Sequence, residues 1–274
     1  MQAQRSSRDS FTVSSPCCAA PLEARGQRPG APFQGPGGTN GIHVEHCRFP
    51  LAFCESPAAL LLIHGTDWNR LDVSDPWTGQ LLSARIHMSP LQEGEDHEHY
   101  LDYFHGRLTA SPDGELLVDD GWVWAPAGIV RVFSLRRWIE LNPWESEDGP
   151  TLLSLCVRHY AWDLPVCRPG AGTLAVWGEG DDDLELTPGV RIFDASTGDE
   201  LRSFPGPAHG LIFADPYLLS HSSAGAAVWD VSTGEKLVTD PQVVPAGHHP
   251  TSRELVTIVP GEGLRLSRLE RPGT

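Results

Sequence analysis

The stretch Val228-Trp229-Asp230-Val231-Ser232-Thr233-Gly234-Glu235-Lys236-Leu237 decides the fold, because it joins two short apolar runs through a turn and recurs along the chain. Glycine supplies the positive φ that such a hairpin needs, and Asp or Ser side chains accept hydrogen bonds from the turn's own amides. Two further copies of the unit, Leu71–Leu82 and Ile192–Leu201, share the Thr-Gly pair. A strand-turn-strand unit that occurs three times predicts a repeat architecture built from β-hairpins.

The spacing of these units indicates the size of the repeat. Val130–Leu135 and Leu264–Leu269 match the first strand of the unit without its turn, so five anchors lie near residues 72, 132, 192, 229 and 265. Successive gaps are 60, 60, 37 and 36 residues. The last two approach the roughly 40–45 residues of one propeller blade, and the first two have room for a blade plus an insertion. We therefore predict an all-β protein, a β-propeller of four-stranded antiparallel blades.

Three details of this propeller follow from the pattern. Five anchors predict about five blades, or six if His87–His105 holds a further one. One short helical insertion is expected after Gly149-Pro150, where apolar residues recur at 3.6-residue spacing from Leu152 to Tyr160. Ring closure is expected to pair a strand at Val44–Phe49 or Leu60–Ile63 with the last blade, because a closed ring leaves no exposed sheet edge.

Two local motifs carry a resemblance to a known family. Ser111-Pro112-Asp113-Gly114 lies between the apolar runs Leu108–Ala110 and Leu116–Val118, and Val228-Trp229-Asp230 precedes a Thr-Gly pair. These units resemble the first hairpin and the third strand of blades in bacterial WD-repeat and YVTN-like β-propeller repeat proteins, over roughly residues 43–270. The Gly-His pair of eukaryotic WD repeats is not repeated here. The resemblance implies a fold and no particular activity.

The beginning of the chain differs in composition from the remainder. Residues 1–41 are rich in Ser, Arg, Pro and Gly, with little that a core would bury, so we expect a disordered tail before a propeller domain at 42–274. The alternative is that this tail is not natively made, since folded-type patterning starts near Val44 and valine codons can start translation in bacteria.

Charge and hydropathy restrict the partners. The formal net charge is −16, and the body after residue 40 is strongly acidic, which repels nucleic acid and anionic lipid. No apolar run is long enough to cross a bilayer and no secretory signal pattern opens the chain, so we expect a cytoplasmic protein with no membrane partner. The single lysine, Lys236, follows a turn, which argues against Schiff-base and lysine-dependent phosphate chemistry.

Metal and nucleophile signals are weak. His97, His99 and His105 lie among carboxylates and are candidate Zn²⁺ or Mn²⁺ ligands, but a hydrated loop is the favoured interpretation because no established metal spacing occurs. The acidic run Glu179–Glu185 lacks the ordered ligands of a calcium loop. Cys156 with His159 lacks a third orienting group, and Gly-x-Ser-x-Gly is absent. No cofactor, metal or catalytic residue is therefore predicted.

An aromatic and acidic stretch is the remaining functional candidate. Tryptophans on strands usually pack between blades, but Trp122 and Trp124 share a face beside two aspartates, and on an exposed rim such a surface would suit a cationic partner. The candidate partner-binding residues are Asp119, Asp120, Trp122, Trp124, Asp181 and Asp183. We predict a monomeric, non-catalytic scaffold that binds another protein or a cationic peptide. The alternative is an enzyme or small-ligand binder that uses the four aspartates at the central channel.

Overall fold

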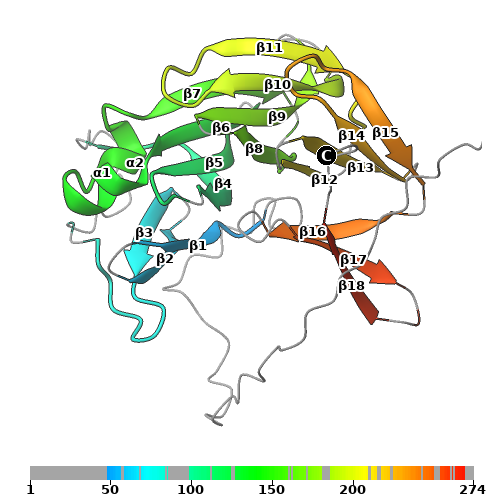
Figure 1. Ribbon diagram of the computed structural model, residues 1–274. Helices are drawn as coiled ribbons and strands as arrows, with labels where there is room; N and C mark the ends of the chain where they lie inside the picture. The colour runs from blue at the N-terminus through cyan, green and yellow to red at the C-terminus, as the bar shows by residue number, and fades with distance from the viewer. Residues whose placement is uncertain are drawn as a thin grey trace, which may run out of the picture.

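Five antiparallel sheets surround a common centre in the computed structural model of this chain, in the manner of propeller blades (Figure 1). The structure describes residues 48–56, 59–67, 69–83, 85, 99–111, 113–124, 127–159, 161, 163–170, 172–180, 186–208, 211–214, 217–222, 225–241, 243–249, 254–259, 261 and 263–268. The sheets found within these residues are called blades 1 to 5 in chain order.

The blades are formed by strands that follow one another along the chain. Blade 1 contains β1 (Leu51–Glu55), β2 (Leu60–Asp67) and β3 (Arg70–Ser74). Blade 2 contains β4 (Phe104–Ala110), β5 (Leu116–Val123), β6 (Ala127–Ser134) and β7 (Leu153–His159). Blade 3 contains β8 (Val166–Gly170), β9 (Thr173–Glu179), β10 (Thr187–Asp194) and β11 (Glu200–Pro205). Blade 4 contains β12 (Leu211–Ala214), β13 (Leu218–Ser222), β14 (Gly225–Trp229) and β15 (Lys236–Asp240). Blade 5 contains β16 (Pro245–His249), β17 (Glu254–Val259) and β18 (Gly263–Arg268).

This arrangement confirms the predicted fold class. Within the described residues there are five sheets, three of them four-stranded, and each strand pairs antiparallel with its neighbour in the chain. All five sequence anchors fall on or beside the third strand of a blade, which explains their spacing. The residues at 104 and 105 belong to β4, so the end of the His87–His105 stretch is part of blade 2. The Ser111 turn joins β4 to β5, the first hairpin of that blade, as predicted.

The three Thr-Gly turns share one geometry. In each of them an aspartate accepts hydrogen bonds from the amides two and three residues later, at 2.7 to 3.2 Å. The aspartates are Asp75, Asp194 and Asp230. The glycine that follows has a φ of +73° to +79° in all three, where a Cβ would be strained. These bonds turn the third strand toward the outer edge of its blade.

The helical insertion lies earlier than predicted. The helices α1 (Leu135–Glu140) and α2 (Glu145–Asp148) follow β6, whereas Leu153–His159 is the strand β7, so the helix expected after Gly149 is wrong. A bulge in the pairing of β6 with β7 leaves both Leu155 and Cys156 buried. The bulge interrupts the two-residue alternation and produces a spacing that imitates a helix. Neither described helix is long and apolar enough to span a bilayer.

Ring closure differs from one of the two predictions. The stretch Leu60–Ile63 cannot pair with the last blade, because it belongs to β2, whose two edges are occupied by β1 and β3. Residues 44–47 of the other candidate lie outside the described residues. In the part of the chain that the structure describes, no strand pairing joins blade 1 to blade 5.

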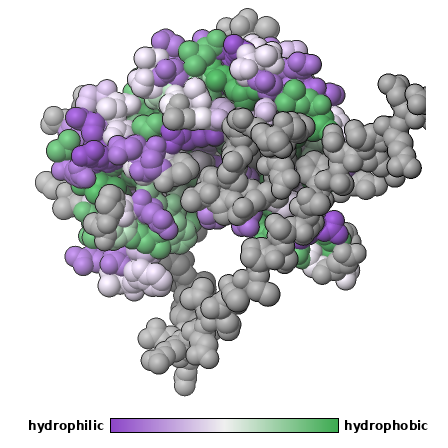
Figure 2. All heavy atoms as spheres, viewed as in Figure 1, coloured by the Kyte–Doolittle hydropathy of each residue, from purple (hydrophilic) through white to green (hydrophobic). Residues whose placement is uncertain are grey.

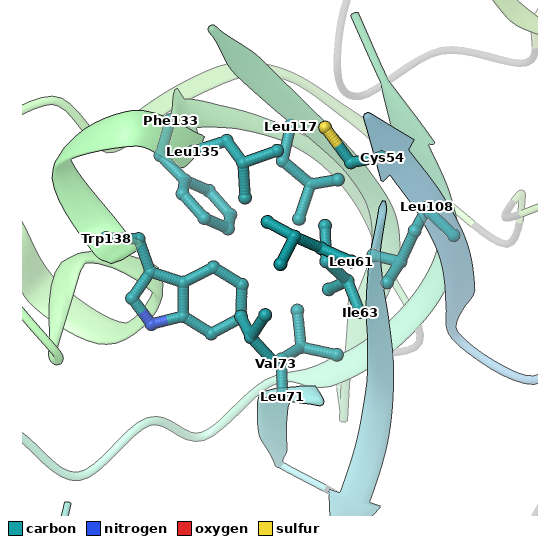
Figure 3. Packing of buried hydrophobic residues seen from close by; sticks show 11 residues of the cluster. Cys54, Leu61, Ile63, Leu71, Val73, Leu108, Leu117, Phe133, Leu135 and Trp138 are labelled. Atoms are coloured by element: carbon teal, nitrogen blue, oxygen red, sulfur yellow. The ribbon is translucent and has the colours of Figure 1, made fainter. Parts of the chain in front are cut away.

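Apolar side chains fill the spaces between neighbouring blades. Figure 3 shows the cluster between blades 1 and 2, in which Phe133 of β6 and Trp138 of α1 pack over Ile63 and Leu71 of blade 1. A second cluster joins blades 2 and 3 through residues such as Val130 and Phe193. A third cluster joins blades 3 and 4, and a smaller one joins blades 4 and 5. The core is therefore a series of interfaces between sheets, which is the packing that a propeller requires.

One carboxylate on the outer side of blade 1 is completely surrounded by donors. Asp72 is 1% exposed and accepts hydrogen bonds from Thr66, from Arg70 at 2.8 Å, and from Ser83 at 2.8 Å. The guanidinium of Arg85 lies 3.3 Å away. Burial alone would raise the pKa of this carboxyl, but these donors lower it below its ordinary value of 3.8. The ionised form is therefore the one that the folded state favours.

This lowered pKa predicts an acid dependence of stability. Because the folded pKa of Asp72 lies below the unfolded one, its contribution is present above pH 3.8 and is lost as the pH falls through the folded value. We expect Asp72→Asn to be less stable than wild type at neutral pH, and the difference to narrow below pH 3.8. Urea unfolding of both proteins at several pH values measures it. A difference that is constant with pH would contradict this role of Asp72.

Candidate functional site

Asp119 and Asp120 are adjacent on β5 and enter two different interfaces, because successive side chains of a strand point to opposite faces. Leu117, on the Asp119 face, packs in the cluster shared with blade 1. Val118, on the Asp120 face, packs in the cluster shared with blade 3. The two aspartates are 1% and 2% exposed. Both predicted partner-binding aspartates therefore lie between blades, and the expected exposed acidic surface is not formed by them.

Asp120 is paired with a buried arginine. Arg158 on β7 donates from Nη2 to Oδ1 of Asp120, and both side chains are 1% exposed. To reach β5 the arginine crosses β6, where its own cross-strand partner is Gly128. Its Nη1 lies 3.5 Å from the backbone oxygen of Trp177 on β9. The pair thus connects the outer strand of blade 2 with its second strand and with blade 3.

The surroundings of Asp120 are buried and charged. Burial raises the pKa of its carboxyl, and the guanidinium groups of Arg158 and Arg107 oppose that rise. Among the described residues, Oδ2 of Asp120 and Nε of Arg158 have no hydrogen-bond partner. A charge pair in a medium of low dielectric is held strongly as long as both members are present. We conclude that this pair acts in the packing of blades 2 and 3.

Asp119 completes a polar cluster on the other face. Its Oδ2 lies 2.6 Å from Nδ1 of His105, and its Oδ1 accepts from the amide of Gly106 at 3.1 Å. Both residues lie at a bulge in β4, where the register with β5 shifts. Adding a Cβ at Gly106 would place it 2.0 Å from the backbone oxygen of Asp120, so only glycine fits there. Asp119 therefore holds an irregular part of the innermost strand.

Tyr103 extends this cluster to the third strand of the blade. Its hydroxyl accepts from the amide of Gly121 at 2.7 Å and donates to the backbone oxygen of Ile129 at 2.9 Å. The guanidinium of Arg131 lies 4.0 Å from the centre of the phenol ring. Burial raises the pKa of Tyr103 well above its usual range, which keeps the hydroxyl protonated. The buried half of the predicted site is consequently a structural network, in which Asp119 and Tyr103 bond to their own blade.

The aromatic half of the predicted site reaches the surface at one residue. Trp122 is 2% exposed and stacks on Phe104, with ring centroids 4.0 Å apart and an interplanar angle of 8°. Trp124 stands edge-on to Trp122 at 5.6 Å and to Phe104 at 5.1 Å, and it is 50% exposed. The two tryptophans do lie on the same side, as the sequence indicates. Of the four described residues predicted to bind a partner, only Trp124 is available to solvent.

An ion-pair cluster that the sequence did not indicate connects three blades. Asp163, in the segment that leads into β8, lies 3.0 Å from Nη2 of Arg107 on β4 and 3.2 Å from Nε of Arg48, which precedes β1. Asp163 has a φ of +54°, a region that Asp tolerates better than most residues. No spacing in the sequence relates residues 48, 107 and 163, so only the ring arrangement brings them together.

The histidine candidates for a metal have separate partners. His99 lies 2.7 Å from a carboxylate oxygen of Asp148 and stacks on Trp144 at 4.6 Å. His105 is bonded to Asp119 inside blade 2. The described residues contain no group of three potential ligands, while His97 lies outside them, as do Asp181 and Asp183. The structure therefore does not bring His99 and His105 into one site.

Two cysteine thiols are held in the less nucleophilic form. Burial raises the pKa of Cys54, with the charges of Asp113 and Glu55 adding to that rise, and burial also raises the pKa of Cys167. Cys156 and His159 occupy β7, where they are three residues apart and face opposite sides of the strand. His159 therefore does not face the Cys156 thiol and is not placed to act as its base.

Comparisons with known proteins find similar solved structures but no similar sequence. No protein-family model matches the sequence, and no curated protein matches it. Among solved structures, the chain is similar to the β-propeller domain of Cps50 (Swd1) from Myceliophteria thermophila, with 16% sequence identity and a TM-score of 0.38. The match covers 68% of this chain and 51% of that one, so the chain spans about half the length of that domain. No residue role is carried over from it.

Proposed function

We propose that this chain is a non-catalytic scaffold whose propeller binds another protein or a peptide through the exposed face of Trp124. The observation that carries the proposal is the half-exposed indole on a fixed aromatic support. Figure 2 shows that hydrophobic residues reach the surface in several places among hydrophilic ones, which is ordinary for a folded protein. Exposure alone therefore does not identify a binding residue. Trp124 differs from other exposed hydrophobic residues because Phe104 and Trp122 hold its ring in place.

That support reduces the entropy that binding must overcome. The ring of Trp124 is bounded by two aromatic side chains, and Phe104 and Trp122 are themselves stacked. A side chain that is ordered before association loses little rotamer freedom when a partner covers it. Tryptophan in such a position is the residue type most enriched among interface residues that dominate binding energy. The position between β5 and β6 also places it at an end of the sheet, where an approaching partner meets loops.

The charge of the chain supports a cationic partner. A formal charge of −16 accelerates association with positive surfaces and disfavours nucleic acid. We infer further that the propeller domain comprises residues 42–274, that it acts as a monomer in the bacterial cytoplasm, and that residues 1–41 are a separate tail. Asp181 and Asp183, in the acidic segment after β9, remain candidates for the same surface.

Trp124→Ser tests this function directly. We expect at least a tenfold loss in retention of the specific partner from native lysate, because a central interface tryptophan contributes about 2 kcal/mol or more. The fold should be unaffected, since the indole is half exposed. Affinity purification with quantitative mass spectrometry compares the variant with wild type.

Leu141→Ser is the matched control, because Leu141 is 69% exposed after α1 and has no role in the proposed surface. It should retain the same partners as wild type. Equal retention by Trp124→Ser and wild type would refute the proposed surface, and turnover of a small substrate by the purified chain would favour the enzyme alternative.

A further inference from the structure

The three Thr-Gly turns form an internal comparison, because one backbone geometry carries different side chains. Two residues after the turn aspartate, blade 1 has Trp77. The copies in blades 3 and 4 have Ser196 and Ser232 at this position. Their amides make the same 2.7 Å hydrogen bond to the turn aspartate. The turn therefore does not need an indole at this position.

A second position of the turn is also apolar in blade 1 and polar in the other two copies. Leu81 in blade 1 corresponds to Glu200 in blade 3 and to Lys236 in blade 4, two charged residues that suit an exposed strand end. The next position is leucine in all three copies and distinguishes nothing. Only the blade 1 copy is therefore apolar at both of these positions. We call Trp77 and Leu81 together the Trp77 patch.

The Trp77 patch lies open to solvent. Trp77 is 82% exposed and Leu81 is 52% exposed. The connection after β3 extends past the end of its sheet, away from the other blades (Figure 1). Packing among the described residues leaves most of Trp77 and half of Leu81 uncovered, and the equivalent turns of blades 3 and 4 have serine and a charged residue at these positions. Such an apolar replacement on a surface is typical of a contact with another molecule.

The charges around the patch indicate the kind of partner. Asp75 belongs to the same turn, and its hydrogen bonds from the amides of Thr78 and Trp77 lower its pKa, so it stays ionised. In the described part of the chain Asp75 has no ion-pair partner, and the two arginines that flank the turn in sequence are paired elsewhere. Arg70 is paired with Asp72, and Arg85 is paired with Glu147 with its side chain 1% exposed. The patch thus presents an indole and a leucine beside an uncompensated negative charge.

We propose that the Trp77 patch is a second binding surface, separate from Trp124, which takes a partner segment with aliphatic side chains next to Lys or Arg. The aliphatic groups cover Trp77 and Leu81, and the cation lies against Asp75. Trp77 lies in the turn that follows a third strand, whereas Trp124 lies between a second and a third strand, so the two surfaces occupy opposite ends of their sheets. One chain can therefore hold two partners at once.

The test uses the full chain and a displayed library of randomised 12-residue peptides. Peptides selected on wild type are titrated against wild type, Trp77→Ser/Leu81→Lys and Trp124→Ser. The double variant has the side chains of the blade 4 turn at these two positions, so its melting temperature should equal that of wild type. The single variant Trp77→Ser, whose serine occurs in both other copies, replaces it if the double variant does not fold.

We expect selected peptides with net positive charge and aliphatic residues that bind the double variant at least tenfold more weakly and bind Trp124→Ser unchanged. The proposal is overturned if no peptide is retained, if the peptides are acidic, or if all of them bind the double variant as tightly as wild type. Concentration-dependent dimerisation of wild type that the double variant lacks would also overturn it, since the occupant would then be a second copy. Peptides that respond only to Trp124→Ser would support the first surface and reject this one.

Discussion

Asp120→Ala is expected to destabilise the propeller by about 3–5 kcal/mol, because it leaves the guanidinium of Arg158 buried without its counter-charge. The cost arises from the unpaired cation rather than from the loss of one contact. Arg158 is 1% exposed, and the neutral backbone oxygen of Trp177, 3.5 Å from its Nη1, does not replace the charge of the carboxylate. Urea unfolding followed by tryptophan fluorescence measures the change.

The matching control removes both charges. Asp120→Ala/Arg158→Met replaces the pair with apolar groups and should recover most of the loss, since buried ion pairs are often no more stabilising than well-packed hydrophobic residues. A single variant within about 1 kcal/mol of wild type, the size of an exposed ion pair, would show that the pair is open to water and that Asp120 is available to a ligand.

Asp119→Ala is expected to cost about 2–6 kcal/mol, because two buried donors lose their acceptor at once and each unsatisfied donor costs about 1–3 kcal/mol. These donors are Nδ1 of His105 and the amide of Gly106, which lie at the bulge of β4. The melting temperature should fall, and the Gly106 amide should exchange its hydrogen faster than in wild type. Both measurements apply to the full chain.

Asp119→Asn provides the comparison for this prediction. Its amide oxygen can accept from one of the two donors, so it should be destabilised by less than Asp119→Ala. Equal stability of wild type and Asp119→Ala would mean that the cluster of Asp119, His105 and Tyr103 does not hold blade 2 together. Asp119 would then be a candidate for binding or catalysis.

These two predictions determine how binding experiments are interpreted. Variants at Asp119 and Asp120 reduce the amount of folded protein, so lost binding in either variant says nothing about a contact surface. Trp122 is equally unsuitable, because it is 2% exposed and stacked on Phe104. Trp124 and Trp77 are the positions where a change in binding can be separated from a change in folding.

The regular parts of the fold were predictable because they depend on local chemistry. Thr-Gly turns need a positive φ and a side-chain acceptor, and both requirements are visible in the residues near Asp194 and Asp230. The sequence of β7 imitates a helix because one bulged residue, Leu155, disturbs the alternation on which strand prediction depends. A single inserted residue has no signature in the sequence, whereas the turns do.

The candidate site was predictable only in part, for a different reason. Adjacent aspartates suggest an exposed acidic surface, since carboxylates are rarely buried without a partner. The partner of Asp120 is 38 residues away and on another strand, and Asp163 is related to Arg48 and Arg107 only through the ring. Long-range pairing of this kind determines whether a charged residue is structural or functional, and the sequence contains no local sign of it.

The dissociation constant of the partner recovered with wild type, titrated against wild type, Trp124→Ser and Leu141→Ser, tests the scaffold function most directly. We predict at least tenfold weaker binding to Trp124→Ser, a change of about 1.4 kcal/mol or more, with Leu141→Ser equal to wild type and all three melting temperatures the same. Equal affinity of Trp124→Ser and wild type would contradict the account, because Trp124 would then be an exposed side chain without a role in binding.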